Sequence, residues 1–351
     1  MSDEIHDIAV IPGDGIGNEV VPAARRVLER AAERHGFALR WHDYDWGCER
    51  YLREGAMMPA DGLERLRGHD AIFLGAVGAP GVPDHVSLWG LLIPIRRAFE
   101  QYVNLRPIRL FDAVHSPLAH PPDIDLVVVR ENVEGEYSEV GGRLYPGQEG
   151  ELAAQLAIFT RRGTERVVRY AFDLAAQRGG RLVSATKSNG IIHTMPFWDE
   201  VVDAVAADFP AVEVERVLID ALCARVVRAP ESLDVIVGSN LFGDILSDLT
   251  AAVAGSIGIA PAANLNPERA HPSMFEPVHG SAPDIAGRGI ANPVGQVWTG
   301  ALMLEHLGRP EAAAAVHRAV ETVLDDRRNH TPDLGGRATT EQVAAALEAA
   351  V

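Results

Sequence analysis

The sequence lacks the excess of basic residues on which nucleic-acid-binding proteins depend. Its 351 residues include 32 Lys and Arg against 49 Asp and Glu, so the formal net charge is −17 at pH 7. Such a charge repels the phosphate backbone of nucleic acids and the surface of anionic membranes. We therefore expect no nucleic-acid and no membrane partner, and a small anionic substrate would need arginines gathered locally.

Cysteines and long apolar runs are also scarce. The two cysteines, Cys48 and Cys223, are far apart and follow no metal-ligand spacing, so we interpret them as reduced thiols. No run free of Gly, Pro or charge approaches the ~20 residues that a membrane span needs. The N-terminal segment MSDEIHDIAVIPGDG is acidic, where a signal peptide would be basic. These absences predict a soluble, cytoplasmic protein.

Length and periodicity indicate the architecture. A chain of 351 residues exceeds the usual size of a single core, which predicts two lobes with an active cleft between them. Longer amphipathic segments (20–34, 161–176) alternate with short β-branched runs (8–11, 71–74, 126–129, 234–237). This alternation predicts an α/β fold with a largely parallel sheet. Residues 107–123 are rich in Pro and His and predict a connection, and residues 138–150 are Gly-rich and predict a connection or a hairpin arm.

Two aspartates stand in an otherwise apolar or small segment, GSNLFGDILSDLTAAVAG (238–255). At a spacing of four, Asp244 and Asp248 would lie one turn apart on one helical face, where like charges repel, most strongly if buried. One interpretation is that Asp244 caps the helix and Asp248 is solvated. The other is a cation between them: with Asp220, at the end of an apolar run, they would form an oxygen-lined site for Mg²⁺ or Mn²⁺.

A glycine turn, IPGDGIGNE (11–19), follows a predicted strand and opens a predicted helix. Gly13, Gly15 and Gly17 give the spacing G-x-G-x-G, whereas the dinucleotide fingerprint is G-x-G-x-x-G. The spacing therefore favours a turn that borders a site over a Rossmann fold.

Three arginines, Arg96, Arg106 and Arg130, occur in the segments PIRRAFEQYVNLRPIRL and VVVRENVEGEYSEVGG. A guanidinium at the end of an apolar strand usually binds a carboxylate. Each arginine alone could pair within the chain, with Glu100 or Glu131. Three together indicate an anionic ligand.

Further candidates follow along the chain. Lys187 comes directly after an apolar strand in SATKSNGIIHTM, and burial beside positive charge would lower its pKa toward that of a usable base. Tyr137, taken alone, is interpreted as a core tyrosine with a satisfied hydroxyl. The segment FEPVHGSAPDIAGRGIANP (275–293) has no helical or strand period, and its apolar and Pro content predicts an ordered loop around a ligand. Asp284 in that loop is a candidate for binding ribose hydroxyls.

In combination these motifs resemble one family. IPGDGIG, NLRP, RENVEGEY, TKSN, NLFGDILSD and EPVHGSAPDIAGRGIANP occur in the same order as in the metal-dependent β-decarboxylating dehydrogenases of isocitrate, isopropylmalate, tartrate and D-malate. The resemblance covers essentially the whole chain. It implies a two-lobed isopropylmalate dehydrogenase-like α/β fold, not a Rossmann fold. Residues 1–102 and 257–351 would form a cofactor-side lobe, and residues 103–256 a middle lobe with the dimer interface and an arm at about 138–156.

The resemblance also implies cofactors and roles. It implies NAD, Mg²⁺ or Mn²⁺ with room for a monovalent cation such as K⁺, and a homodimer or higher homo-oligomer with shared active sites. The implied metal ligands are Asp244 and Asp248 together with Asp220 of the partner subunit. Lys187, also contributed by a partner subunit, would be the base and Tyr137 the acid, and Arg96, Arg106 and Arg130 would bind and orient the substrate carboxylate that leaves as CO₂. The implied cofactor-binding residues are His279, Gly280, Ser281, Ala282, Asp284, Ile285 and Asn292, and Asp284 favours NAD over NADP.

The identity of the substrate is the most detailed of these expectations. The segment before Arg96, VSLWGLLIPIR, lacks the patterns of the isocitrate and isopropylmalate enzymes. Trp89 is bulky enough to fill the space that a C3 substituent of the substrate would occupy. Alternatively it packs beneath the loop and has no effect on the choice of substrate. VPDHVSLWG, MMPADGL, FTRRGTERVVRYAFDLA and MPFWDE resemble the D-malate and tartrate branch of the family. We expect D-malate to be converted to pyruvate and CO₂, with tartrate and 3-isopropylmalate as weaker substrates; the alternatives are 3-isopropylmalate oxidation in leucine biosynthesis and a non-catalytic metabolite-binding homologue. A metal-dependent hydrolase or lyase would leave the loop at 279–292 unexplained.

Overall fold

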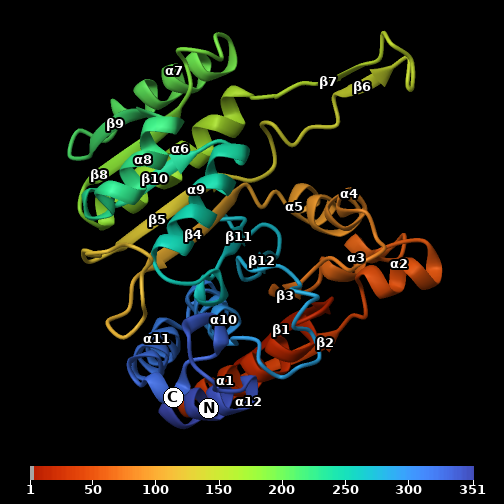
Figure 1. Cartoon of the computed structure of the whole chain (residues 1–351), viewed down its shortest axis with the longest axis vertical. Helices are drawn as coiled ribbons and strands as arrows, with labels where there is room; N and C mark the ends of the chain where they lie inside the picture. The colour runs from red at the N-terminus through yellow and green to blue at the C-terminus, as the bar shows by residue number, and fades with distance from the viewer. Residues whose placement is uncertain (1–3) are drawn as a thin grey trace. The chain divides into compact units, whose positions relative to one another are not determined.

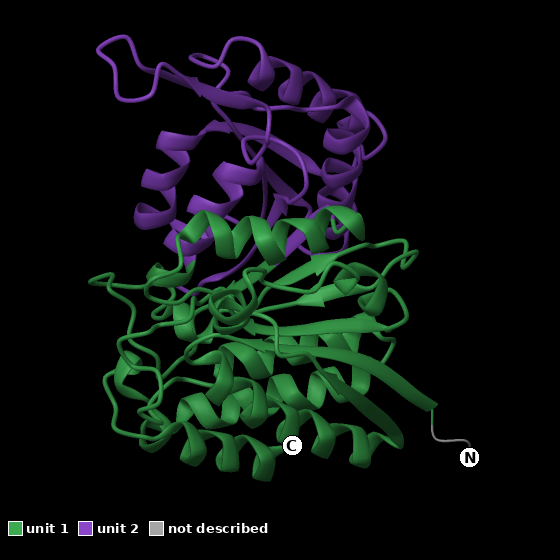
Figure 2. Ribbon diagram, turned by 90° about the vertical axis from the view of Figure 1, so that its right-hand side faces the viewer, with its two compact units in different colours: residues 1–101, 106–121, 251–351 green, residues 102–105, 122–250 purple. Residues whose placement is uncertain are grey.

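The computed structural model describes residues 4–351 and divides the chain into two compact units (Figure 2). Unit 1 contains the residues up to 101, residues 106–121 and residues 251–351, and unit 2 contains residues 102–105 and 122–250. The predicted lobes place the changes of lobe at 102/103 and 256/257, and the roles assigned to these lobes stay predictions. Strand β4 (Val103–Arg109) passes from unit 2 into unit 1.

Unit 1 contains a mostly parallel sheet with the strand order β2-β1-β3-β12-β11. β1 is parallel to β2 and to β3, β12 is parallel to β3, and β11 is antiparallel to β12. The central strand β3, AIFLGA, is buried at every residue, as expected for a parallel strand covered on both faces. The strands are β1 (Glu4–Gly13), β2 (Phe37–Asp43), β3 (Ala71–Ala76), β11 (Ala263–Leu265) and β12 (Ser273–Phe275).

Four helices of unit 1, α1, α10, α11 and α12, pack against one another. Gly300 lets α10 approach α1 closely, because a Cβ at that position would lie 2.5 Å from a methyl carbon of Leu28. A series of short helices follows β2 and β3. The helical segments of unit 1 are α1 (Gly17–His35), α2 (Cys48–Glu54), α3 (Gly62–Leu66), α4 (Asp84–Ser87), η1 (Leu88–Leu92), α5 (Ile93–Ala98), η3 (Ile257–Ile259), α10 (Val294–His306), α11 (Pro310–Asp325), η4 (Arg327–Asn329), η5 (Pro332–Leu334) and α12 (Thr340–Ala350).

Unit 2 contains four parallel strands in the order β5-β10-β8-β9. Helix α6 packs on β5 and β10, and its apolar face buries Val167, Val168 and Phe172. The elements of unit 2 are β5 (Asp125–Glu131), β6 (Gly141–Leu144), β7 (Leu152–Gln155), α6 (Arg161–Gln177), β8 (Arg181–Thr186), α7 (Thr194–Ala206), β9 (Glu213–Leu218), α8 (Ile219–Arg228), η2 (Pro230–Ser232), β10 (Val235–Gly238) and α9 (Asn240–Val253), whose last residues belong to unit 1.

Strands β6 and β7 form an antiparallel hairpin that extends away from the rest of unit 2 (Figure 1). Every residue of both strands is exposed, including Leu144 and Leu152, and Tyr145 beside them is exposed as well. Of the two alternatives for residues 138–150, the structure therefore forms the hairpin. Residues 110–124 form a connection without helix or strand, so the connection predicted for residues 107–123 is confirmed except at residues 107–109, which belong to β4.

The predicted short strands and long helices are confirmed, and one placement is wrong. Asp220 was predicted at the end of a strand in apolar surroundings, but β9 ends at Leu218 and Asp220 is the second residue of α8. Its side chain is 67% exposed, because α8 buries the face that carries Leu222 and Val226. Both cysteines are free thiols. Within residues 4–351, no helix has the length and apolarity needed to cross a membrane.

Candidate active site

Arg130 is the buried centre of a polar cluster in unit 2. Its guanidinium pairs with Asp244 and donates from Nε and Nη2 to Oδ1 of Asn240, at 3.1 and 2.7 Å. Strand β5 and helix α9 come close enough for these contacts because residue 243 is glycine: a Cβ there would lie 2.5 Å from the Cβ of Arg130. The charge of Arg130 is thus fixed against the first turns of α9.

Tyr137 completes this cluster. Its hydroxyl donates to Oδ2 of Asp244 at 2.8 Å, and the guanidinium of Arg130 lies 5.4 Å from the centre of its ring. Asp244 sits inside α9, so it is not the helix cap that one interpretation proposed. Its side chain is 32% exposed, and an ionised carboxylate has about four acceptor sites. Solvent therefore still reaches the Asp244 carboxylate beside Arg130 and Tyr137.

Lys187 and Asp220 form a second pair in unit 2. Nζ of Lys187 lies 2.5 Å from Oδ1 of Asp220, and the ammonium lowers the pKa of the Asp220 carboxyl. Lys187 directly follows β8, as predicted, but its side chain is 30% exposed in the single chain. The burial expected for a catalytic lysine is therefore only partial without further protein around it.

The carboxylates predicted to bind a metal are divided between these two groups. Asp244 and Asp248 lie one turn apart on α9, with Asp248 exposed, whereas Asp220 is paired with Lys187. Within residues 4–351 of one chain, no three His, Cys, Asp or Glu side chains come together as a metal site. A hard cation suits the carboxylate oxygens of α9; the contribution of Asp220 from a second chain, which the resemblance implies, stays a prediction.

Arg96, on α5 in unit 1, is also buried and paired. Its guanidinium lies 2.5 Å from Oε1 of Glu276, which accepts a second hydrogen bond of 2.8 Å from Asn264. Nε of Arg96 is buried without a hydrogen-bond partner. Arg106, the third predicted arginine, is buried in β4. Sequence reasoning offered Glu100 and Glu131 as partners and did not name Glu276, because 180 residues separate it from Arg96.

Trp89 lies in η1, a π-helical stretch between α4 and α5. Such stretches are uncommon and occur frequently at functional sites. Trp89 is half-buried, and the guanidinium of Arg97 lies 5.0 Å from its ring centre. The two predictions for Trp89, contact with a C3 substituent and simple packing, both stay open.

The predicted cofactor loop is held by the glycine turn at the start of α1. The backbone N–H of Ile16 donates to the carbonyl of Ser281 at 2.9 Å. The carboxylate of Glu19 accepts from the backbone N–H groups of Gly287 and Gly289, at 2.6 and 2.8 Å. The turn therefore borders the loop, as its spacing predicted, and Glu19 is a positioning residue that sequence reasoning missed.

Two side chains in this loop have unused polar atoms. His279 is buried and uses Nδ1 toward the carbonyl of Gly280 at 3.0 Å, but its Nε2 has no partner. Burial lowers the pKa of His279, which favours the neutral ring. Asp284 is exposed and makes no hydrogen bond within residues 4–351. An orphaned imidazole nitrogen and an open carboxylate are groups that a nucleotide cofactor would satisfy.

The remaining predicted cofactor residues support the loop. Ile285 packs with Ile16, Val20 and Ala291 in a small apolar cluster, and Ala282 packs against the same cluster. Ala282 has a positive φ of 41°, a conformation that a non-glycine residue adopts only under constraint.

A pocket of about 750 Å³ in unit 1 is lined in part by Ser256, Gly258 and Asp333. Nδ2 of Asn292 donates to Asp333 at 3.1 Å, and the hydroxyl of Ser256 donates to the same carboxylate at 2.7 Å. Asp333 was not named from the sequence, since it lies about forty residues beyond the loop. It links the end of the predicted cofactor loop to this pocket.

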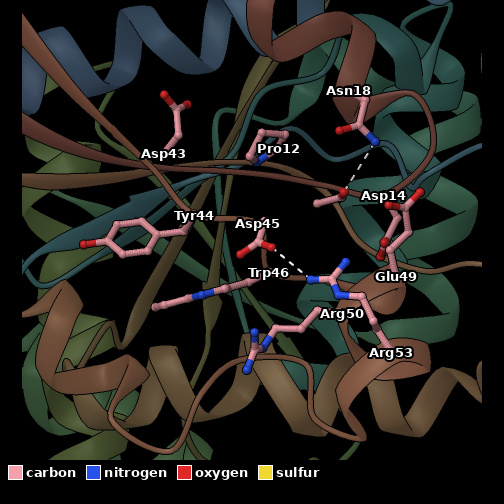
Figure 3. A pocket seen from close by; sticks show the side chains of 12 residues that line it. Pro12, Asp14, Asn18, Asp43, Tyr44, Asp45, Trp46, Glu49, Arg50 and Arg53 are labelled. Carbon is pink, nitrogen blue, oxygen red and sulfur yellow. Dashed lines mark hydrogen bonds and ion pairs between the residues drawn. The ribbon is translucent and has the colours of Figure 1, made fainter.

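A smaller polar pocket, of about 340 Å³, lies where β1 and β2 end (Figure 3). Both arginines in its lining are paired, Arg53 with Asp45 at 2.9 Å and Arg50 with Glu54 at 2.5 Å. Asp14 accepts from two backbone N–H groups. No unpaired cation is left in the lining to bind an anionic ligand, so this pocket is not part of the candidate site.

Comparisons with known proteins agree with the fold and the motif order. The family model described as isocitrate/isopropylmalate dehydrogenase matches residues 7–347. The chain is 56% identical to a D-malate dehydrogenase (decarboxylating) of Escherichia coli strain K12, with 97% of each chain covered. It is 56% identical to a probable tartrate dehydrogenase/decarboxylase of Bacillus subtilis strain 168, covering 96% of this chain and 95% of the relative. Its structure matches the isocitrate dehydrogenase of Methylococcus capsulatus with a TM-score of 0.90 at 36% identity, over 98% of this chain and 99% of the other.

Proposed function

Because the chain belongs to the isocitrate/isopropylmalate dehydrogenase family, we propose that it oxidises D-malate to pyruvate and CO₂ with NAD⁺ and a divalent metal. Tartrate and 3-isopropylmalate would be weaker substrates. The observation that carries the proposal is the cluster of Asp244 between Arg130 and the hydroxyl of Tyr137, which joins a cation ligand, an anion-binding group and a proton donor. D-malate and tartrate, rather than 3-isopropylmalate, are the substrates in the names of the 56% identical relatives.

The proposed reaction also needs a divalent metal and NAD⁺, which are not part of the chain. Asp244 and Asp248, with Asp220 of the partner subunit, would hold Mg²⁺ or Mn²⁺. When bound, the metal supplies a Lewis acid at the C2 oxygen of the substrate and NAD⁺ supplies the hydride acceptor. The partial exposure of Asp244 and the exposure of Asp248 fit a carboxylate-bound cation.

The proton steps fall to two side chains. Lys187 takes the proton of the 2-hydroxyl while hydride leaves C2 for NAD⁺, which gives the 2-keto acid. The bond from C3 to the distal carboxylate then breaks, CO₂ leaves, and the electron pair stays on the enolate of pyruvate. Tyr137 donates its proton to C3 of this enolate. One proton is taken and one is returned, so the products are pyruvate, CO₂ and NADH.

Arginines bind the two carboxylates of the substrate in this proposal. Arg130 is already held by Asn240 and Asp244, so its orientation costs little entropy on binding. Arg96 has one buried nitrogen, Nε, without a hydrogen-bond partner, and Arg106 is buried in β4.

NAD⁺ is the expected cofactor because of the loop at 275–293. The orphaned Nε2 of His279 and the open carboxylate of Asp284 support this choice. A carboxylate accepts from ribose hydroxyls and repels a 2′-phosphate. We expect kcat/KM to be higher with NAD⁺ than with NADP⁺ and the preference to shrink in Asp284→Asn; a wild-type preference for NADP⁺ would contradict the assignment.

A homodimer with shared sites is part of the proposal. An isolated two-stranded hairpin is marginally stable in water, and the hairpin β6–β7 carries exposed Leu144, Leu152 and Tyr145, which a second chain would cover. If Lys187 serves the partner's site, co-expressed Lys187→Met and Asp244→Asn chains should recover about a quarter of wild-type activity through mixed dimers, each with one intact site. Each variant alone should be inactive. Absence of recovery in purified mixed dimers would show that each site belongs to one chain.

The substrate is tested by measuring kcat/KM from NADH formation with D-malate, L-malate, the tartrates, 3-isopropylmalate and isocitrate side by side. D-malate should give the highest value, and excess EDTA should abolish turnover until Mn²⁺ or Mg²⁺ is returned. A preference of about tenfold or more for 3-isopropylmalate or isocitrate is equivalent to ~1.4 kcal/mol. It would contradict the assignment of D-malate as the substrate and leave the proposed mechanism unchanged. Absence of NADH with every substrate would favour a binding homologue.

A further inference from the structure

Unit 1 has a second polar pocket at the amino ends of its parallel strands, which we name the amino-edge pocket. Its volume is about 430 Å³, and its lining includes Arg67, Arg269 and four histidines, His6, His69, His271 and His306. The candidate cofactor loop instead follows the carboxyl end of β12. The two features therefore belong to opposite ends of the same strands.

Strand register gathers three of the histidines in a row. Ile8 of β1 and Ser273 of β12 both pair with Ala71 of β3. His6 stands two residues before Ile8, and His69 stands two residues before Ala71. His271 likewise stands two residues before Ser273. Adjacent parallel strands thus bring three imidazoles together from positions far apart in the sequence.

The fourth histidine comes from a helix. His306 ends α10, which packs on β12, and its ring centre lies 5.5 Å from that of Phe275. Burial and the nearby Arg269 lower the pKa of His306 to about 4, so this ring is neutral at pH 7. It offers an N–H donor to a ligand rather than a charge.

Arg269 supplies an unmatched positive charge. No carboxylate within residues 4–351 pairs with its exposed guanidinium, whereas Arg67 is paired with Glu64 at 3.2 Å. Asp70 is the carboxylate in the lining; its Oδ2 accepts from the backbone N–H of Asp7 at 2.8 Å, which ties it to β1, and it does not pair with Arg269. In a chain with a net charge of −17, an uncompensated arginine beside four imidazoles makes a local site for an anion.

The backbone at Arg269 is constrained as well. Its φ is +55°, which glycine adopts freely and a long side chain adopts at a cost of the order of 1 kcal/mol or more. Asn266 fixes the turn, because its Oδ1 accepts from the backbone N–H groups of Ala270 and His271 at 2.8 and 3.2 Å. The chain thus has an arginine at a position where glycine would cause less backbone strain.

A metal is a poorer occupant than an anion. Among residues 4–351, no three His, Cys, Asp or Glu groups have the arrangement that a metal needs, and a cation would face Arg269 and Arg67. We propose that the amino-edge pocket binds a small oxyanion with two or more negative charges, a phosphate ester or a polycarboxylate. The guanidinium of Arg269 is its main contact, and the imidazole N–H groups are additional donors.

Calorimetric titration of the whole protein with pyrophosphate and, separately, citrate tests this proposal. Arg269→Gly removes the guanidinium and suits the positive φ, so the variant should unfold at a temperature no lower than the wild type. Binding should weaken by about tenfold or more, the loss expected for one charge-assisted contact. Arg269→Lys should retain part of the affinity. The stronger probe identifies the class, phosphate or polycarboxylate.

Arg53→Gln is the matched control, since Arg53 lines the other polar pocket of unit 1 and is paired with Asp45. It should leave the affinity of both probes unchanged. Equal binding to the wild type and to Arg269→Gly would place the anion elsewhere, for example at the arginines of the candidate active site, and would overturn the proposal. So would the absence of saturable binding of either probe. The dehydrogenase assay is independent: failure to form NADH would leave these titrations unaffected.

Discussion

Two buried arginines, one in each unit, differ in how their carboxylate partners meet solvent. In the pair of Arg96 and Glu276 the side chains are 7% and 10% exposed, and Asn264 takes up a further acceptor site of Glu276. In the pair of Arg130 and Asp244 the exposures are 2% and 32%. The first pair is closed, whereas the second leaves its carboxylate accessible.

The difference separates a carboxylate that is enclosed in its ion pair, Glu276, from one that solvent still reaches, Asp244. The effect of a closed ion pair on stability is large mainly when one partner is removed, because the other charge is then buried without a counter-ion. An open carboxylate beside a fixed cation can bind a second positive group without rearrangement. We therefore expect substitutions at Glu276 to affect folding first and substitutions at Asp244 to affect turnover first.

The largest effect is expected from Asp244→Asn. Asparagine keeps the size of the side chain but removes the charge that would hold a metal, so kcat/KM with D-malate should fall by about a thousandfold or more, ~4 kcal/mol in the transition state. The free energy of unfolding, measured in urea, should fall by less than it does when the closed pair is broken, because Oδ1 of Asn240 still binds the Arg130 guanidinium at 2.7 Å and solvent reaches the site. Activity within tenfold of the wild type at saturating Mn²⁺ would remove Asp244 from the catalytic groups.

Glu276→Gln should have the opposite profile. Removing this charge leaves the Arg96 guanidinium buried without a counter-ion, and we expect a loss of about 3 kcal/mol or more in the free energy of unfolding. Asp61→Asn, which breaks an exposed pair with Arg65, is the control and should unfold like the wild type. A loss at Glu276 no larger than that of the control would mean that the closed pair contributes nothing to stability.

A third buried carboxylate, Glu131, extends the comparison because backbone N–H groups of Val133 and Glu134 hold it. Burial raises its pKa from 4.5 to about 7. Between these values the folded chain binds more protons than the unfolded chain, so this group makes the free energy of unfolding fall as pH rises through that window. In Glu131→Gln the fall between pH 5 and pH 8 should shrink by up to a few kcal/mol. Parallel pH profiles of urea unfolding for both proteins would contradict this.

The smallest effect is expected from Gly243→Ala. The added methyl group would lie 2.5 Å from the Cβ and 3.0 Å from the Cα of Arg130, so α9 must shift away from β5. We expect a loss of about 1 to 3 kcal/mol in stability and a fall in kcat as Arg130 leaves Asp244. Gly150→Ala, with no atom within 4 Å of the new methyl group, should change neither quantity.

The sequence predicted what depends on neighbours along the chain. The apolar runs became β1, β3, β5 and β10, and the spacing of four placed Asp244 and Asp248 one turn apart on α9. The ordered loop was predicted from its composition alone. Such features follow from local periodicity and turn chemistry.

Contacts between distant segments could not be predicted in this way. Glu276 and Glu19 bind groups that lie 180 and about 270 residues away, and no local pattern marks either carboxylate. The amino-edge pocket combines segments from four places in the chain, three of them joined by strand register and the fourth supplied by the end of α10. The burial of Lys187 was overestimated because a single chain leaves it 30% exposed.

The hydrogen bonds that Gly287 and Gly289 donate to Glu19 have a consequence for the folding of the chain during its synthesis on the ribosome. Helix α1 also pairs Arg26 with Glu341 at 2.9 Å, and Arg34 donates to the carbonyl of Val351. These partners are made 268 to 317 residues after the residues of α1 that they bind, while most of unit 2, residues 122–250, emerges in between as one continuous stretch. Since domains fold as units during translation, unit 2 can fold on the ribosome before α1 meets its partners in unit 1.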